Sequence, residues 1–403
     1  MNDLFQYIGG AAGCGKTWEA KEMMHQSPFE TRLTATTGIA AINCSDDDFT
    51  CTTINSLLWY KDTDALEDAE VQGKLDMALR QLWSGGVTHI MIDEVSMMSG
   101  RQLDIIVNAI DRLNELHGYD PAIRLTILGD FCQLPPVAEK EEGFAFEAKC
   151  WDRFEDNKII MTEIKRQADK EFINALRAVR RGAGPDAVDF FSPYIAQMVD
   201  VDFQGTTIFG YNREVDRFNK LRLDRLDTEW VRFPSHRFGK QLPEWKNIPQ
   251  VFETKLDSLV MLLVNKSIKG SGGIFEYVNG DLGYIREAYK DRAVVELIRT
   301  GGYVEVAYTV KENVAKKEGK RYVSGTCEHV PLRVAYATTC HKSQGLTLDR
   351  VQVNINTKFF KEGGMTYVAL SRARSPEGLR IVAGSERTFI NRCRTSPKVE
   401  RWL

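Results

Sequence analysis

Residues 10 to 17 place glycines, a lysine and a threonine at a spacing that can hold phosphate groups. The segment reads GAAGCGKT, with Gly10, Gly15, Lys16 and Thr17 at the fixed positions of the pattern G-x-x-x-x-G-K-[ST] and a further glycine, Gly13, between them. Glycines let backbone N–H groups close around phosphate oxygens. The lysine ammonium reaches the β- and γ-phosphates, and the threonine hydroxyl can coordinate Mg²⁺. The pattern predicts a site for ATP and Mg²⁺, with a plain glycine-rich turn as the alternative.

An apolar run at residues 90–92 ends in two adjacent carboxylates, Asp93 and Glu94. In nucleotide hydrolysis, one such acid holds Mg²⁺ and the other polarises the attacking water. On this interpretation Asp93 binds the metal and Glu94 acts as the base. Two acids after a strand are, taken alone, equally typical of the first turn of a helix. The neighbouring phosphate-binding pattern favours the catalytic interpretation.

The elements that must position these residues alternate between strand-like and helix-like patterns. Such alternation predicts parallel α/β sheets. The first 130 residues contain four predicted strands, at 4–8, 31–35, 87–92 and 123–128, and a predicted amphipathic helix at 102–116. A second alternation begins near residue 159, with strands at 159–161 and 206–209 and helices at 169–181, 185–198 and 212–226.

The pattern changes between residues 227 and 330. Turn sequences there separate β-rich runs at 292–298 and 303–310, which predicts a small β-barrel inserted into the second α/β unit. The α/β alternation resumes with strands at 333–337, 351–355 and 379–382.

Composition bounds the class of protein. The 403 residues predict two to three domains at about 150 residues each. No apolar run approaches the roughly 18 residues that span a bilayer, and no basic N-terminal region precedes an apolar one. The eight cysteines form no C-x-x-C pair, and the net charge is only −3. We therefore expect a cytoplasmic protein of a bacterium or a phage-infected cell, whose nucleic-acid contacts, if any, are local.

Several further motifs together resemble those of superfamily 1 helicases. They are TTGIAA at 36–41, LGDFCQLPP at 128–136, KRQ at 165–167, TTCHKSQG at 338–345 and YVALSRA at 367–373. Their order is that of the RecD-like branch, superfamily 1B, which includes the petite-integration-frequency (PIF) helicases and small phage helicases. The resemblance covers residues 9 to 373.

The resemblance implies an α/β fold of two RecA-like motor domains with parallel sheets and an SH3-like β-barrel inserted in the second. The expected boundaries are 1–158 for the first motor domain and 159–226 with 331–403 for the second. The insertion is expected at 227–330. A wedge that separates DNA strands would lie within 57–86, where Trp59 and Tyr60 are candidates, although apolar packing is an equal alternative for both.

The same resemblance implies roles around ATP. Gln133 is similar to a glutamine that senses the γ-phosphate. Arg166 and Arg372 are similar to two arginines that the second motor domain presents to that phosphate, with a surface ion pair as the alternative for each. Gln344 and Gly345 would lie near the γ-phosphate from the same side. A planar, permanently charged guanidinium suits the spread charge of phosphoryl transfer.

Seven residues are implied as contacts to single-stranded DNA. They are Thr36, Thr37, Thr52, Thr53, His341, Lys342 and Ser343. Hydroxyls, backbone N–H groups and a few cations suit contacts to phosphates that do not depend on sequence. Helix capping is the alternative for each threonine and does not exclude the contact.

The leading hypothesis is an ATP-dependent DNA helicase that moves 5′ to 3′ on single-stranded DNA and opens duplexes at junctions. Replication or repair proteins are possible further partners. An RNA helicase of the same superfamily and a P-loop protein that uses nucleotide as a switch remain alternatives. One departure concerns adenine: family members read it with a glutamine upstream of the phosphate-binding loop, where this sequence has only Gln6. Base specificity therefore stays open, and several nucleoside triphosphates are compatible with the sequence.

Overall fold

The computed structural model describes residues 4–45, 49, 51–136, 139–241, 245, 248–264, 266–267, 275–277, 280–317 and 320–402. The chain divides into two compact units. The first comprises Met1–Val199, Ile208–Gly210 and Thr339–Leu403, and the second comprises Asp200–Thr207 and Tyr211–Thr338. Within the described ranges, no helix combines the length and apolar character that a membrane crossing requires.

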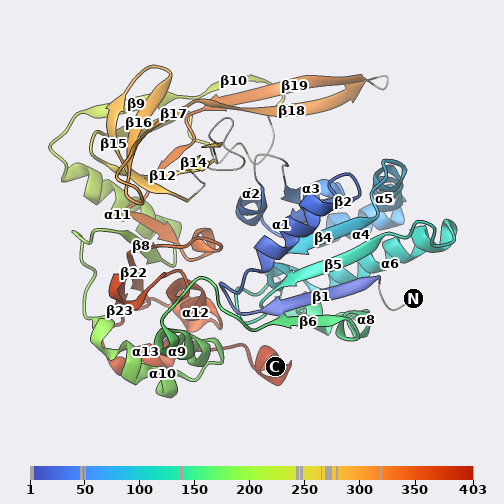
Figure 1. Ribbon diagram of the computed structural model, residues 1–403, viewed down its shortest axis with the longest axis horizontal. Helices are drawn as coiled ribbons and strands as arrows, with labels where there is room; N and C mark the ends of the chain where they lie inside the picture. The colour runs from blue at the N-terminus through green and yellow to red at the C-terminus, as the bar shows by residue number, and fades with distance from the viewer. Residues whose placement is uncertain are drawn as a thin grey trace. The chain divides into compact units, whose positions relative to one another are not determined.

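A six-stranded parallel sheet organises the N-terminal part of the first unit, with the order β3-β2-β4-β5-β1-β6. Figure 1 shows β2, β4, β5, β1 and β6 side by side in blue to green. Their bounds are β1 (Phe5–Gly10), β2 (Thr31–Ala35), β3 (Thr52–Thr53), β4 (His89–Asp93), β5 (Arg124–Gly129) and β6 (Lys158–Met161). The apolar residues Ile90, Met91 and Ile92 of β4 are all buried, as expected for a strand covered on both faces. The four strands predicted in the first 130 residues are thus present.

The helices of this part lie between the strands along the chain. They are α1 (Lys16–Gln26), α2 (Gly38–Cys44), α3 (Ile54–Leu57), α4 (Thr63–Val71), α5 (Lys74–Ser84), η1 (Val95–Met97), α6 (Gly100–Leu116), α7 (Glu139–Glu142), η2 (Ala145–Glu147) and α8 (Asp152–Glu155). The α6 helix starts with a capping box, because the side chains of Ser99 and Gln102 each bond to the other's backbone N–H. Its apolar face, including Leu103 and Ile110, is buried, as the periodicity predicts.

A second sheet has the order β21-β8-β22-β23-β7. Its strands are β7 (Ile195–Ala196), β8 (Thr206–Phe209), β21 (Ala337–Thr339), β22 (Val351–Asn354) and β23 (Leu379–Val382). The division between the two units runs through β8 and β21. The accompanying helices of the first unit are α9 (Lys170–Arg180), α10 (Gly184–Phe191), η3 (Ser192–Tyr194), η5 (His341–Ser343), η6 (Phe359–Lys361), α12 (Met365–Leu370), η7 (Pro376–Gly378), α13 (Glu386–Arg392) and α14 (Pro397–Trp402).

Two predicted strands belong to other sheets than expected. The strand at 159–161 is β6, which pairs with β1 at the edge of the first sheet. The strand at 333–337 is β20 (Leu332–Val334), which pairs antiparallel with β12 (Leu259–Leu262), and it is β21 that joins the second sheet. An apolar run identifies a strand, but the partner depends on contacts distant in sequence. The expected domain boundaries themselves stay predictions.

The helix expected at 185–198 is also shorter than predicted. It ends as α10 at Phe191, and β7 then pairs with β23. Pro193 follows within two residues. Proline lacks the N–H that a continuing α-helix would need, and the chain continues through Ser192–Tyr194 as the short helix η3.

Antiparallel sheets dominate the second unit, as predicted for the insertion. The largest has the order β17-β16-β15-β12-β20, and a three-stranded sheet has the order β10-β19-β18. Besides β12 and β20, the bounds of the elements of this unit are α11 (Asn212–Asp224), β9 (Trp230–Pro234), β10 (His236–Gly239), β11 (Val251–Lys255), β13 (Lys266–Ser267), β14 (Phe275–Tyr277), β15 (Leu282–Ala288), β16 (Arg292–Leu297), β17 (Tyr303–Ala307), β18 (Thr309–Lys317) and β19 (Lys320–His329). Alternate residues of β16, namely Ala293, Val295 and Leu297, enter the core, which is typical of a sheet with one buried face.

Candidate active site

The phosphate-binding loop joins β1 to α1 with a backbone that favours glycine. Gly13 and Gly15 have φ angles of +84° and +92°, in the left-handed region. A Cβ on Gly13 would lie 2.6 Å from Cβ of Arg166, so the close approach of that segment also requires glycine. Lys16 begins α1, and its ammonium donates hydrogen bonds to the carbonyl oxygens of Gly10 at 2.8 Å and Ala11 at 3.1 Å. The ammonium is thereby held inside the loop.

The two predicted acids follow β4 and face this loop. The Thr17 hydroxyl donates to Oδ2 of Asp93 at 2.6 Å, and the N–H of Glu94 donates to Oδ1 at 2.8 Å. Burial, followed by the charge of Asp93, raises the pKa of Glu94 to about 7, against the opposing effect of Lys16. A carboxyl with a pKa near neutrality can accept a proton from water, which is the property of a general base.

Side chains that follow the second sheet approach the same acid. Gln344 donates from Nε2 to Oε2 of Glu94 at 3.1 Å. Arg372 is buried and donates from Nε to the carbonyl of Val368 at 2.8 Å. Burial and the charge of Arg372 lower the pKa of Arg166 to about 9. Because the positive charge of Arg372 disfavours the charged form of Arg166, an anion beside the two guanidinium groups would be favoured.

A cleft of about 530 Å³ brings most of these groups together. Its lining includes the predicted residues Gly13, Gly15, Lys16, Thr17, Asp93, Glu94, Gln133, Arg166, Gly345 and Arg372. The side-chain oxygen of Gln133 is buried and, among the described residues, accepts no hydrogen bond, so it can serve a ligand in the cleft. Gly10 and Gln344 lie outside the lining but bond to Lys16 and Glu94.

The cleft also contains residues outside the sequence motifs described above, among them Trp18 and Asn43. Trp18 lies at its edge with 55% of its surface exposed, and the ammonium of Lys165 lies 4.9 Å from the centre of its ring. Asn43 contacts the segment at Gly345, where a Cβ would come within 2.3 Å of its amide nitrogen. An aromatic residue directly after the lysine and threonine of the loop was the available signal for Trp18.

The threonines predicted to contact DNA have hydroxyls engaged close by. Thr36 donates to the carbonyl oxygen of Glu94 at 2.8 Å. Thr37 accepts from the N–H of Ala40 at 3.2 Å, and Thr53 accepts from that of Ser56 at 3.2 Å as the N-cap of α3. Thr52 is exposed on β3. The capping alternative is therefore realised for Thr37 and Thr53, and the contact to DNA stays a prediction.

The predicted DNA-contacting residues of the second sheet lie on η5. His341 and Lys342 are exposed, whereas Ser343 is buried and donates from its hydroxyl to the carbonyl of Cys340 at 2.8 Å. Partial burial lowers the pKa of His341, which keeps its imidazole neutral at pH 7. Ser343 is thus placed to shape this turn, and the side chains of His341 and Lys342 are the accessible ones.

The two wedge candidates differ in exposure. Trp59 is 53% exposed and has a φ of +62°, an uncommon conformation for a bulky residue. Tyr60 is buried. The structure therefore assigns apolar packing to Tyr60 and leaves Trp59 available.

Comparison with known proteins shows similarity to DNA helicases. A family model described as an AAA domain matches residues 1–194. The chain is 31% identical over 393 residues to the ATP-dependent DNA helicase PIF1 of Xenopus laevis, covering 93% of this chain and 58% of that relative. It is 29% identical over 400 residues to the ATP-dependent DNA helicase Pif1 of Bdellovibrio bacteriovorus, covering 98% of this chain and 86% of the relative. The chain thus spans less than two thirds of the vertebrate relative's length.

Solved structures extend the similarity to the fold. The Pif1 of a Bacteroides species in complex with ADP-AlF4 has a TM-score of 0.76 and 26% identity, covering 100% of this chain and 93% of that one. The Bacteroides Pif1 with ADP-AlF3 and single-stranded DNA has a TM-score of 0.62 and 25% identity, covering 100% and 94%. The expected class, two parallel sheets with antiparallel sheets inserted, is confirmed. The expected likeness to small phage helicases stays a prediction. Over nearly its whole length, the chain is similar to Pif1 DNA helicases.

Proposed function

We propose that this chain is an ATP-dependent DNA helicase that moves along single-stranded DNA and opens duplexes. One observation carries the proposal: the phosphate-binding loop and the acid pair share a single cleft with Arg166 and Arg372. A nucleotide switch would need the loop and the metal-binding acid, but not two further arginines, one after β6 and one after α12. Such arginines stabilise the charge of phosphoryl transfer when the two sheets close on ATP. They withdraw from the phosphates when the sheets open.

The residues of the cleft have complementary roles in this proposal. Lys16 and the backbone N–H groups of the loop bind the phosphates, and Glu94 orients and deprotonates the attacking water. Gln133 senses the γ-phosphate, and Arg166 and Arg372 stabilise the charge that develops during transfer. Gln344 fixes the carboxylate of Glu94 through its hydrogen bond.

The oxygens of Thr17 and Asp93 fit Mg²⁺. They lie 2.6 Å apart beside the loop, and Mg²⁺ binds through one or two protein oxygens together with phosphates and water. When bound, the ion would neutralise charge on the β- and γ-phosphates. Among the described residues, no group of three or more His, Cys, Asp and Glu side chains could hold a metal by itself. This site would therefore depend on the nucleotide for its remaining ligands.

We also propose single-stranded DNA and forked junctions as the polymer substrate. The supporting facts are the similarity to Pif1 DNA helicases, the similar Bacteroides protein crystallised with single-stranded DNA, and the exposed η5 residues His341 and Lys342. Movement 5′ to 3′ and a wedge at Trp59 belong to the same proposal. An enzyme that uses ATP on DNA works where both are found, which in a bacterial or phage-infected cell is the cytoplasm.

The nucleoside base is proposed to stack on Trp18. The indole is exposed at the edge of the cleft, and Lys165 lies over its ring. Stacking tolerates any base because every base has a π-face. Trp18→Ala should therefore raise the KM for ATP and GTP by similar factors, whereas Trp18→Phe should keep both near wild type. A change confined to ATP would contradict a base-tolerant platform.

Steady-state ATPase without polymer, with single-stranded DNA and with RNA tests the function. Stimulation by DNA above that by RNA supports the proposal, stimulation by RNA alone favours an RNA helicase, and no stimulation favours a nucleotide switch.

The direction of movement is tested on duplexes with a single-stranded tail at one end. We expect those with a 5′ tail to open, and preferential opening of 3′-tailed duplexes would contradict the proposed direction.

A further inference from the structure

Asp130 is a buried carboxylate that accepts hydrogen bonds from several donors. Its motif gave it no role in the sequence-based interpretation above. It directly follows β5 and is fully buried. Arg180, the last residue of α9, donates to its Oδ1 from Nη2 at 2.8 Å and from Nε at 3.1 Å. The N–H of Cys132 donates to the same oxygen at 3.1 Å. Burial alone would raise the pKa of Asp130, but the charge and hydrogen bonds of Arg180 hold it below its usual value. The carboxylate therefore remains ionised and depends on its donors.

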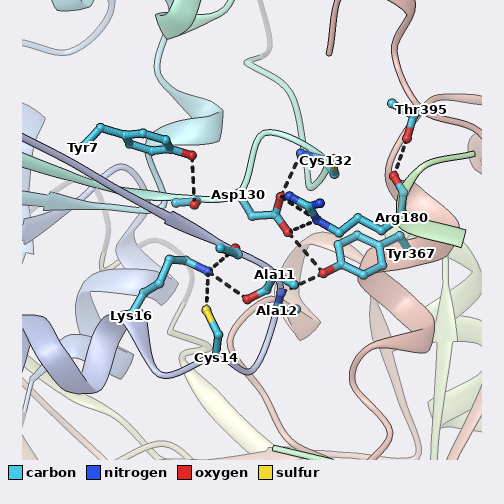
Figure 2. Close-up of polar contacts among 12 residues, drawn as sticks. Tyr7, Ala11, Ala12, Cys14, Lys16, Asp130, Cys132, Arg180, Tyr367 and Thr395 are labelled. Atoms are coloured by element: carbon cyan, nitrogen blue, oxygen red, sulfur yellow. Dashed lines mark hydrogen bonds and ion pairs between the residues drawn. The ribbon is translucent and has the colours of Figure 1, made fainter. Parts of the chain in front are cut away.

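The hydroxyl of Tyr367 completes this set and extends it to the phosphate-binding loop. It donates to Oδ2 of Asp130 at 3.1 Å and accepts a hydrogen bond from the N–H of Ala12 at 2.7 Å, as Figure 2 shows. Burial, followed by the charge of Asp130, raises the pKa of Tyr367 well above its ordinary value. The hydroxyl thus keeps the proton that it donates. One buried phenol therefore joins two loops that are distant in sequence.

Both loops carry groups that line the nucleotide cleft. Ala12 lines it directly and lies beside Ala11, whose carbonyl oxygen accepts a hydrogen bond from Lys16. Gln133 also lines the cleft, and its N–H donates to the carbonyl of Asp130 at 2.9 Å. A displacement of the Tyr367 hydroxyl would therefore shift both Ala12 and Gln133 in the cleft.

Tyr367 lies on α12, which is connected to both the second guanidinium and the η5 segment. The helix ends two residues before Arg372. At its other end, the thiol of Cys340 donates to the carbonyl of Met365 at 3.5 Å, and Cys340 directly precedes η5. Gly364 packs against the loop of Gln133 so closely that a Cβ there would lie 2.4 Å from its carbonyl oxygen. The α12 helix thus contacts the cleft loops and the segment expected to contact DNA.

We propose that Tyr367 is a positioning residue that couples the two nucleotide-contacting loops to α12, and through α12 to the η5 segment. The inference rests on the helicase function proposed above. Tyr367 does not touch the nucleotide in this scheme; it sets where Ala12, Gln133 and Arg372 stand relative to the phosphates. Loss of such positioning lowers kcat more than it changes nucleotide affinity, because the groups matter most in the transition state.

Tyr367→Phe tests this, with Tyr7→Phe as the matched control. Tyr7 lies on β1, is equally buried, and donates from its hydroxyl to the carbonyl of Gly129 at 3.3 Å, one residue before Asp130. Both variants therefore remove one buried phenolic hydroxyl next to the same loop. Only Tyr367→Phe removes the hydrogen bonds to Asp130 and Ala12. The measurements are kcat and KM for ATP with and without saturating single-stranded DNA, and the melting temperature.

We expect Tyr367→Phe to lower DNA-stimulated kcat about tenfold, because small misplacements of catalytic groups have effects of this order or larger. The KM for ATP should change by less than about threefold, and the melting temperature should fall no more than in Tyr7→Phe. Equal kcat values for the two variants, or a change in KM alone, would overturn the proposal. If DNA does not stimulate the ATPase of the wild-type protein, the proposed helicase function is wrong. The positioning role of Tyr367 is then decided by comparing the kcat values of Tyr367→Phe and Tyr7→Phe measured without DNA.

A second variant tests whether Arg180 acts through the same path. Arg180→Lys keeps the positive charge but loses the two-pronged contact to Asp130. It should lower kcat by a smaller factor than Tyr367→Phe, and the double variant should lose less than the product of the two factors, because residues in one network are not additive. Multiplicative effects would show that Arg180 and Tyr367 act separately and would overturn the shared path.

Discussion

The nucleotide cleft and the expected strand-contact positions use polar side chains in opposite ways. In the cleft, hydrogen bonds join residues far apart in sequence: Gln344 bonds to Glu94, and Thr17 bonds to Asp93. At most strand-contact positions, hydroxyls bond to near neighbours, whereas Thr36 donates to the carbonyl oxygen of Glu94. Thr53 bonds to Ser56, and Ser343 bonds to Cys340. The first region is assembled by tertiary structure, and the second by short turns and helix ends.

This difference matches the two kinds of chemistry proposed. Phosphoryl transfer needs charges held in fixed positions before the reaction begins, and long-range contacts between buried groups supply this rigidity. A sequence-independent grip on a strand needs only accessible hydroxyls, N–H groups and cations. We therefore expect single substitutions to have large effects in the cleft and small ones at the strand-contact positions.

The largest effects are expected for Lys16→Ala and Glu94→Gln. Each should lower ATP hydrolysis at least about 100-fold, since catalytic carboxylates and phosphate-binding cations contribute effects of that order. The two should differ in binding: Glu94→Gln should retain nucleotide, as measured with a fluorescent analogue, whereas Lys16→Ala should lose it. Glu30→Gln makes the same change at an exposed turn and serves as control. A Glu94→Gln protein with more than about a tenth of wild-type activity would exclude Glu94 as the base.

Arg166→Ala and Arg372→Lys should come next. Both should lower DNA-stimulated ATPase by about 100-fold, because the guanidinium groups act on the transition state across the cleft. Affinity for single-stranded DNA, measured by fluorescence anisotropy, should stay within about threefold of wild type. Arg181→Ala, at an exposed position after α9, is the control. If an arginine variant lost DNA affinity but kept its ATPase turnover, that arginine would belong to the strand-contact positions instead.

The pH dependence of kcat/KM sharpens the assignment of Glu94. Its raised pKa of about 7 means that the carboxyl is protonated below that value and cannot accept a proton from water. We expect kcat/KM to rise with pH and level off above about 7, falling about tenfold per pH unit on the acid side. Gln344→Ala removes a hydrogen bond that favours the ionised form, so it should move this midpoint to higher pH. An unchanged midpoint would remove Gln344 from this role.

The smallest effects are expected at the strand-contact positions. Lys342→Ala should weaken binding of single-stranded DNA only a few fold at low salt. It should also reduce the slope of log affinity against log salt by about 0.7, the value for one phosphate contact on a single strand. Lys170→Ala, an exposed lysine at the start of α9, should leave the slope unchanged. Equal slopes for wild type and Lys342→Ala would contradict the predicted contact.

Local sequence was sufficient wherever geometry depends on adjacent residues. The glycines of the phosphate-binding loop adopt the positive φ angles that their pattern requires, and β4 ends at Asp93 with Glu94 next to it. The predicted strands at 31–35 and 379–382 have the same bounds in the structure. Backbone conformation at these places is set by residue type and by neighbours within a few positions, so it can be read from a single sequence.

Partners across the chain could not be read in this way. Tyr367 and Asp130 both lie in recognisable motifs, but no sequence pattern indicated that Arg180 would meet them or that the N–H of Ala12 would bond to the phenol. Likewise, the strand at Lys158–Met161 was evident, but its place beside β1 was not. The sequence by itself determined the loop, the acid pair and most of the strands, because these follow from local conformational preference. Only the tertiary structure decided which sheet each strand joined and which buried charges met, because those choices depend on packing between segments distant in sequence, such as Asp130 with Arg180 and Ala12 with Tyr367.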